Sequence, residues 1–451
     1  MGFFIGMRAK KEEALERIEE ALKIDRQQKD TEAIVIDLTN LGAVLRSLED
    51  YERARTCLEE GHQLCEVIQN PNKQAYILNS LGNTYRSLGK DDEAIHSFQR
   101  VLKITEQNRN PIIQCYSLTS LAHMYFRKER IQESLQLYEQ AIDVSRKTEH
   151  AEGLSASLRM LGEVLLGMGR QPDALPYLHE AATIFARLKD DDSEALMWSN
   201  IATAQEREKN YPDAITAWEK VLTLQKAANN SPGELEAIEG MARVTRHQAD
   251  DPARTLQYYG EALVLAEELN DRNKQGDLLN TLGILEWQQG AYKEALGWYE
   301  RALKIFQELD DLVHQGLVLN SLGVTLTKLN RYEEALNRLK AALKFHYQTK
   351  ENLLKGHALA ALGDVHYEMG KPDEALRCYA LALKIRQGIG DRKGEGWMMY
   401  HLARVYASQG AKESARDYLN QASRIAKECK DGKLKEICNE LQNSSLMKRR
   451  K

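Results

Sequence analysis

The sequence predicts an all-α chain built from repeated helix-turn-helix units, and three observations support this class. An apolar residue followed by Gly or Ala recurs along the chain every 40 residues, with one step of 41. A second small residue follows twelve positions later in nearly every unit. Only 8 of the 451 residues are proline, and runs of β-branched residues are absent, so nothing in the composition favours strands.

The recurring pair marks ten successive units. In the sixth unit the second small residue comes one position late, at Thr255, which places the extra residue in the turn around Asp250-Asp251-Pro252. Two antiparallel helices approach closely only where one of them lacks a side chain, so the small residues are expected at helix crossings. Units of this kind bury their apolar faces only by stacking, which predicts a single solenoid domain. The pairs are Leu41-Gly42, Leu81-Gly82, Leu121-Ala122, Leu161-Gly162, Ile201-Ala202, Met241-Ala242, Leu282-Gly283, Leu322-Gly323, Leu362-Gly363 and Leu402-Ala403.

Each unit is expected to contain two helices. Pro176 lies about four residues inside the second helix of the fourth unit, which predicts a late start or a kink there. The other seven prolines stand at helix starts, and Asx residues cap the helix that opens the next unit, at Asn70, Asn110, Asn230 and Asp391. The first helix ends before a glycine suited to the left-handed conformation in five units, at Gly89, Gly169, Gly290, Gly370 and Gly410.

The N-terminal segment, residues 1–25, is interpreted as a truncated unit whose first helix is cut, with Met1-Gly2 in the position of the recurring pair. Terminal repeats usually present a polar outer face, but Phe3, Phe4 and Ile5 are apolar. Either the chain continues upstream, or a partner covers this edge, which would allow self-association.

The C-terminal segment is expected to form an amphipathic capping helix over 431–443, followed by a basic tail, 444–451. The tail ends in Lys448-Arg449-Arg450-Lys451. This run is typical of a solvated tail, the favoured interpretation, or of a nuclear-localisation signal. We otherwise expect a cytoplasmic protein, because the six cysteines form no CxxC pair and no signal peptide is present.

Composition argues against several classes of function. The net charge of −5 argues against nucleic-acid binding through bulk positive charge, and no apolar run is long enough for membrane insertion. No phosphate-binding loop, metal-ligand motif or catalytic constellation appears, so we expect no enzymatic activity and no cofactor. His357, His366 and His401 come from neighbouring units, but we interpret them as isolated surface or groove histidines.

The repeat resembles the tetratricopeptide repeat (TPR). The residues that carry the resemblance are the Leu-Gly-x-x-Tyr of Leu81 to Tyr85, the Glu-Ala-Leu of Glu294 to Leu296, Tyr299, Ala302 and Lys304-Ile305. It covers residues 31–424, as ten units of about 40 residues. The long period is similar to that of kinesin light chains, Pins/LGN adaptors and bacterial Rap-type or sensor-arm repeats. The resemblance implies a right-handed superhelix whose first helices line a concave groove for peptides or partner proteins.

In this geometry five positions of each first helix face the groove: six and three residues before the small residue, and one, four and five after it. Asn79, Asn280 and Asn320 share one slot, where their amides either bind a peptide backbone or bond between neighbouring helices. The repeated arginines of the first three units either bind carboxylates or phosphates or are solvated groove charges. The candidate partner-binding residues are Arg46, Asn79, Asn83, Arg86, Phe126, Arg127, Asn280, Trp287, Asn320, Tyr367, Trp397, Tyr400 and Arg404.

The sequence therefore favours a non-enzymatic adaptor that binds a protein or extended peptide in its groove. The partner segment is expected to be acidic or phosphorylated where it meets the N-terminal units. The alternative is a sensor arm of a larger signalling protein, such as a STAND-type ATPase. A third class, a hydrolase, lacks the side-chain constellation it would need.

Overall fold

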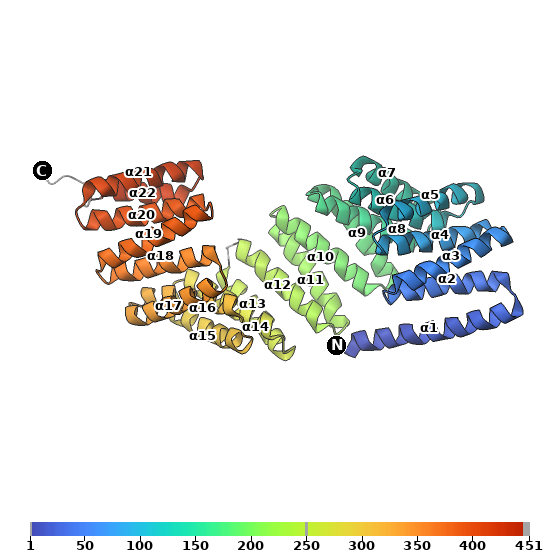
Figure 1. Ribbon diagram of the computed structural model, residues 1–451, viewed down its shortest axis with the longest axis horizontal. Coiled ribbons are helices and arrows are strands. Elements are labelled where there is room, and N and C mark those ends of the chain that lie inside the picture. Colours follow the sequence, from blue (N-terminus) through green and yellow to red (C-terminus); the bar gives the residue numbers. More distant parts are fainter. Residues whose placement is uncertain (1, 249–250, 445–451) are drawn as a thin grey trace. The chain divides into compact units, whose positions relative to one another are not determined.

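The computed structural model describes residues 2–248 and 251–444, with side chains described from residue 11 onward (Figure 1). Throughout these ranges every regular element is a helix, twenty-two in number, which confirms the all-α class. The basic run Lys448–Lys451 and the residue Asp250 of the sixth turn lie outside the described residues.

The chain's contacts fall into two compact units, Met1–Ala237 and Ile238–Lys451, where the sequence predicts one uninterrupted run. The division falls inside α12 (Ser231–Gln248), in the repeat where the spacing slips by one residue. The first unit also contains α1 (Gly2–Gln28), α2 (Thr31–Ser47), α3 (Tyr51–Ile68), α4 (Pro71–Ser87), α5 (Asp91–Asn108), α6 (Pro111–Arg127), α7 (Ile131–Lys147), α8 (Ala151–Gly167), α9 (Gln171–Leu188), α10 (Asp191–Arg207) and α11 (Tyr211–Ala227).

The second unit has the same alternation of helices. Its last helix, α22, packs on α20 and α21 and buries Leu434, Cys438 and Leu441, in the segment where the sequence predicts a capping helix. The helices are α13 (Pro252–Glu268), α14 (Arg272–Gln288), α15 (Tyr292–Glu308), α16 (Leu312–Lys328), α17 (Tyr332–Gln348), α18 (Asn352–Glu368), α19 (Pro372–Gly388), α20 (Arg392–Ser408), α21 (Lys412–Glu428) and α22 (Gly432–Asn443).

Within each unit the helices stack as pairs. A first helix packs on the second helix of its own pair, as α4 does on α5 and α16 on α17. Neighbouring first helices also contact one another, as α2 does with α4 and α16 with α18. Among the described residues no comparable contact joins successive second helices. The first helices therefore lie on the inner, concave side of each unit, and the α-solenoid predicted from the repeat is confirmed.

The small residues lie at the crossings, as the sequence predicts. A Cβ atom built on Gly323 would lie 2.4 Å from Leu339 Cγ, and one built on Gly363 would lie 2.6 Å from Tyr379 Cε1. In both pairs the contacting side chain lies sixteen positions after the glycine. Any larger residue at these glycines would overlap a buried side chain.

The predicted turn and cap residues also take their places. The five glycines expected after first helices all have positive φ, between 69° and 82°. Other turns place a non-glycine residue there, such as Glu49 at 67°. The four predicted Asx caps each accept a hydrogen bond from the backbone N–H three residues on, as Asn70 Oδ1 does from Lys73 at 3.1 Å.

Two local expectations differ from the structure. Helix α9 begins at Gln171 with Pro176 inside it, so the second helix of this unit does not start late. Residues 2–28 form one continuous helix instead of the end of one helix, a turn and a second helix. The reason lies in the sequence from Met7 to Lys11, Met-Arg-Ala-Lys-Lys, which contains helix formers and no residue that terminates a helix.

Candidate interaction face on the first helices

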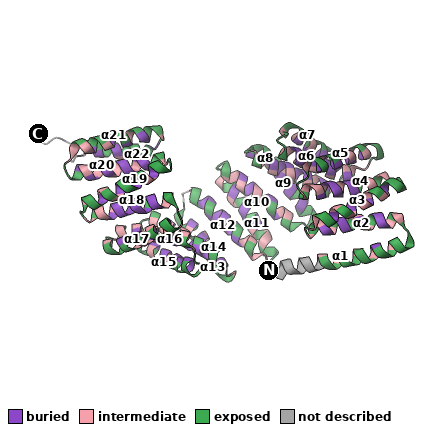
Figure 2. Cartoon of the chain, viewed as in Figure 1, coloured by how far each residue is buried: buried purple, intermediate pink, exposed green. Residues whose placement is uncertain are grey.

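We use the term first-helix face for the side chains at the five groove positions of each first helix. Figure 2 shows that, along the helices of both units, buried residues alternate with partly and fully exposed ones. Of the thirteen candidate residues, Arg127 is exposed and the other twelve are half-buried. The first unit holds those from Arg46 to Arg127 and the second unit those from Asn280 to Arg404.

The three candidate arginines of the first unit differ in their partners. Arg127 Nη1 lies 3.4 Å from Asp91 Oδ1 and forms an ion pair. The side chains of Arg46 and Arg86 make no ion pair or hydrogen bond among the described residues, although both residues are half-buried. Burial, and then the charges of Arg46 and Arg127, lower the pKa of Arg86. The structure therefore brings the arginines within electrostatic reach of one another and leaves two of them uncompensated.

The three asparagines that share one slot differ in their hydrogen bonds. Asn79 Oδ1 accepts a hydrogen bond from Ser117 Oγ on the next first helix at 3.0 Å, so this amide bonds between helices. Asn280 and Asn320 make no hydrogen bond within the described part of the chain, and the Oδ1 atom of each is buried without a partner. The amide oxygen of each is thus left without a donor among the described residues. Asn83 donates to the backbone oxygen of Asn79, within its own helix, at 3.0 Å.

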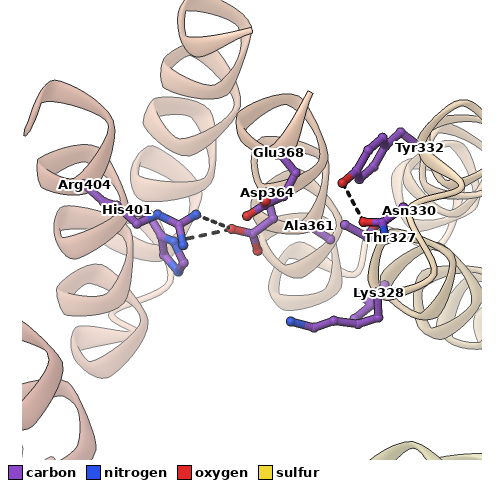
Figure 3. Close-up of a pocket in the computed structure, with 10 residues that line it drawn as sticks. Thr327, Lys328, Asn330, Tyr332, Ala361, Asp364, Glu368, His401 and Arg404 are labelled. Atoms are coloured by element: carbon purple, nitrogen blue, oxygen red, sulfur yellow. Dashed lines mark hydrogen bonds and ion pairs between the residues drawn. The ribbon is translucent and has the colours of Figure 1, made fainter. Parts of the chain in front are cut away.

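The second unit has a cavity of about 440 Å³ on its first-helix face (Figure 3). Its wall combines one exposed ammonium and one exposed carboxylate, those of Lys328 and Glu368, and neither forms an ion pair among the described residues. The side chains come from α16, α18 and α20, from the turn before α17 and from Tyr332 at the start of α17. They are Val324, Thr327, Lys328, Asn330, Tyr332, Ala361, Asp364, Glu368, His401 and Arg404.

A polar network closes one side of this cavity. Arg404 Nη2 donates to Asp364 Oδ1 at 3.2 Å, and the Tyr379 hydroxyl donates to the same oxygen at 2.6 Å. The Arg404 guanidinium carbon also lies 4.2 Å from the centre of the Tyr367 ring, as a cation–π contact. The two candidates Arg404 and Tyr367 are therefore brought together, and the charge of Arg404 is compensated within the fold.

Two of the candidate aromatic residues, Trp397 and Tyr400, make contacts within the fold. Trp397 Nε1 donates to Asp431 Oδ2 at 3.1 Å, which ties α20 to the cap of α22. Tyr400 lies against Trp397 with ring centres 6.4 Å apart. Trp287 Nε1 is buried without a hydrogen-bond partner. Of the two tryptophans, only Trp287 therefore has an unused indole donor.

His401 lies against Tyr379, with ring centres 5.0 Å apart, and burial lowers its pKa to about 4. Because the unfolded chain takes up a proton near pH 6.5 and the folded chain does not, stability should fall as pH decreases from 6.5 toward 4. We expect His401→Phe to remove about 1–2 kcal/mol of the stability difference between pH 7.5 and pH 5.

Urea denaturation at both pH values would measure that loss. The control is the same substitution at the exposed His96, which should follow the wild type. An equal pH dependence for His401→Phe and the wild type would contradict a neutral His401 in the folded chain.

Sequence reasoning missed the tyrosines that reach this face from second helices. Tyr379 is fully buried and lies at the crossing with Gly363, yet its hydroxyl bonds Asp364 and Arg404 on first helices. Tyr138 occupies the equivalent position, sixteen residues after Ala122. A tyrosine at that offset was the available signal, because its ring fills the crossing while its hydroxyl extends beyond it.

Stacked helical pairs with an inner face of this kind define an α-solenoid repeat protein. A tetratricopeptide repeat family profile matches residues 32–107, 114–187, 245–308, 274–348 and 356–428, and a second one matches 159–232. These segments cover more than half of the chain, so the chain belongs to the tetratricopeptide repeat family. Repeats of this family serve as protein-interaction scaffolds. A profile for anaphase-promoting complex subunit 5 matches residues 4–48, and no curated protein matches the chain.

Solved structures with TM-scores above 0.5 show the same fold. The apo form of RapI is 15% identical, with a TM-score of 0.55, over 79% of this chain and 99% of that one. A STAND protein with a tetratricopeptide repeat sensor from Pyrococcus horikoshii is also 15% identical, with a TM-score of 0.52, over 76% of this chain but only 55% of its own. Putative kinesin light chain TPR-like repeats from Podosopora anserina are 19% identical, with a TM-score of 0.37, over 43% of this chain and 96% of theirs. No helix in the described ranges has the length and apolar character needed to span a bilayer.

Proposed function

We propose that the chain is a non-enzymatic scaffold whose first-helix face binds an extended segment of a partner protein. The observation that carries the proposal is the set of polar groups that the fold leaves without partners on this face. Arg46 and Arg86 are uncompensated in the first unit, and Asn280 and Asn320 have unused amides in the second. Half-buried polar groups of this kind gain stability when a ligand satisfies them.

The two units favour different features of a bound segment. In the first unit the arginines favour acidic side chains, because guanidinium groups pair with carboxylates in two-point hydrogen bonds. In the second unit the asparagine amides favour a peptide backbone, which offers both a donor and an acceptor. Each such amide bond contributes roughly 0.5–1.5 kcal/mol. The alternative of a sensor arm in a larger signalling protein rests on no contact in this structure.

The test is capture of partner proteins from a native lysate by three forms of the chain. The first form is the wild type, and the second carries Arg46→Glu, Arg86→Glu and Arg127→Glu on the first-helix face. The third carries the same charge change on exposed second-helix residues, as Lys103→Glu, Arg187→Glu and Lys220→Glu. Circular dichroism establishes that all three forms fold.

We expect a partner held by the wild type and by the second-helix variant to be lost from the first-helix variant. The loss should be greatest at low salt, because exposed charge pairs are screened as ionic strength rises. Equal capture by all three folded forms at low salt would contradict an acidic partner segment on this face.

A further inference from the structure

One pair of positions on neighbouring second helices holds an ion pair in one place and two exposed apolar residues in another. Glu267 on α13 binds Arg301 on α15 at 3.2 Å, and the two residues are 34 positions apart. Tyr347 on α17 and Leu381 on α19 follow these two positions by two repeats. Tyr347 is 57% exposed and Leu381 is 54% exposed. Two large apolar side chains thus face solvent where the repeat elsewhere places opposite charges.

Basic side chains lie beside both apolar residues, on the same side of each helix. They stand three, four or seven positions away along the chain, which is the spacing of side chains that share one side of an α-helix. All are exposed, and none forms an ion pair in the described part of the chain. Together with Tyr347 and Leu381 they form what we call the basic–apolar patch. Its basic members are Lys340, Lys344, Arg377 and Lys384.

The helices of this patch offer it no carboxylate. The acidic residues of α17 and α19 lie in their first turns, and the following stretches, 335–350 and 375–390, contain no Asp or Glu. The equivalent stretch of each other second helix, from α3 to α21, contains at least one. Lys355 Nζ lies 5.0 Å from the centre of the Tyr347 ring, so the ring's own charged neighbour is also a cation. The patch is therefore apolar at its centre and positively charged around it.

We propose that the basic–apolar patch binds a short acidic segment of a second protein, in which a large apolar side chain stands between carboxylates. Tyr347 and Leu381 receive the apolar side chain, and the surrounding cations pair with the carboxylates. The net charge of −5 favours a short segment over an extended polyanion, which would also meet the acidic rest of the surface. The patch lies on second helices, so this inference goes beyond the proposed function and shares no residue with it.

The probes are three degenerate peptide libraries with random ends and a fixed centre of Glu-Glu-Leu-Glu-Glu, Glu-Glu-Ser-Glu-Glu or Lys-Lys-Leu-Lys-Lys. Retention on the immobilised full chain should be at least about tenfold greater for the first library than for the other two, a ratio that corresponds to 1.4 kcal/mol. The serine library tests the apolar contact, and the lysine library tests the charge. The preference for leucine over serine should persist in the variant with three Arg→Glu changes on the first-helix face, because that variant leaves the patch intact.

Two double variants remove the patch in different ways. Lys344→Glu with Lys384→Glu reverses part of its charge, and Tyr347→Ala with Leu381→Ala removes its apolar centre. Each should reduce retention of the acidic leucine library about fivefold or more. All four side chains are exposed, so thermal stability should change little. A loss of retention without a loss of stability is the result that assigns the patch to binding.

The matched control is Lys103→Glu with Lys304→Glu. These two lysines are exposed and occupy, in α5 and α15, the position of the repeat that Lys344 and Lys384 occupy in α17 and α19. The control therefore makes the same substitution at the same position with the same change in net charge. It should retain the acidic leucine library within about twofold of the wild type, because only the local arrangement of the patch differs.

Three results would overturn the inference. One is equal retention of the acidic leucine and serine libraries by the wild type. Another is retention by both patch variants that equals retention by the control. The third is patch-dependent binding of phosphatidylserine vesicles without retention of the acidic leucine library, which would assign the patch to an anionic membrane surface. None of these results bears on the first-helix face, whose test uses other residues.

Discussion

Gly323→Leu should unfold at a clearly lower urea concentration than the wild type, with a loss of about 1–3 kcal/mol or more. The first atom of the new side chain would already lie 2.4 Å from Leu339 Cγ. Leu339 is fully buried. The helix pair must therefore separate, and the stacking of neighbouring pairs is disturbed with it.

The matched control is Gly297→Leu. Gly297 is an exposed residue in the middle of α15, and a Cβ atom built on it would have no heavy atom within 4 Å. Leucine is a better helix former than glycine, so this substitution should raise stability by about 0.5–1 kcal/mol. The same substitution, glycine to leucine, is thus expected to lower the stability at Gly323 and to raise it at Gly297. Equal unfolding midpoints for Gly323→Leu and the wild type would show that the crossing lies elsewhere.

Tyr379→Ala should cost about 3–5 kcal/mol, the range for removing a large buried aromatic side chain. The ring fills the space over Gly363 and has no exposed surface. Its removal also takes away the hydroxyl that donates to Asp364 and contacts Arg404. Both the packing of the crossing and the polar wall of the second-unit cavity are lost together.

Tyr347→Ala is the control for that prediction. Tyr347 lies on the neighbouring second helix α17 and is 57% exposed, so its removal should change stability by less than about 0.5 kcal/mol. Chemical denaturation followed by circular dichroism compares the two variants. Similar losses for both tyrosines would mean that the residue sixteen positions after the glycine does not fill the crossing.

Much of the fold could be predicted because its determinants repeat. The glycine at each crossing, the left-handed glycine of the turn and the Asx cap are each set by local sterics or hydrogen bonding, and their spacing gives the period. The continuous helix α1 was missed because the spacing of Gly2 from Ala14 matched the repeat. A matching interval does not replace the turn residues that end a helix.

The partners of individual side chains were harder to predict, although one signal was present. Asn79 bonds Ser117, which lies 38 positions later, and Thr119 bonds Ser157 at the same offset. The residues 38 positions after Asn280 and Asn320 are Val318 and Ala358. Neither side chain can donate or accept a hydrogen bond, so these two amides remain free.

The compensation of charges depends on which residue types occupy the positions that contact each arginine. Arg86 lies four residues after its small residue and Arg127 five residues after its own, and Asp91, in the first turn of α5, pairs with Arg127. The unused hydroxyl of Tyr138 depends likewise on which residues of neighbouring helices reach it. Such differences arise from the non-repeating residues, which give one scaffold its own binding preference.

Hydrogen exchange of the full chain, alone and with its captured partner, tests most directly whether partners bind the first helices. We expect slower exchange in α2, α4 and α6 of the first unit and in α14 and α16 of the second, with the paired second helices α3, α5, α7, α15 and α17 little changed. Protection confined to those second helices, with unchanged exchange in the first helices, would contradict this expectation.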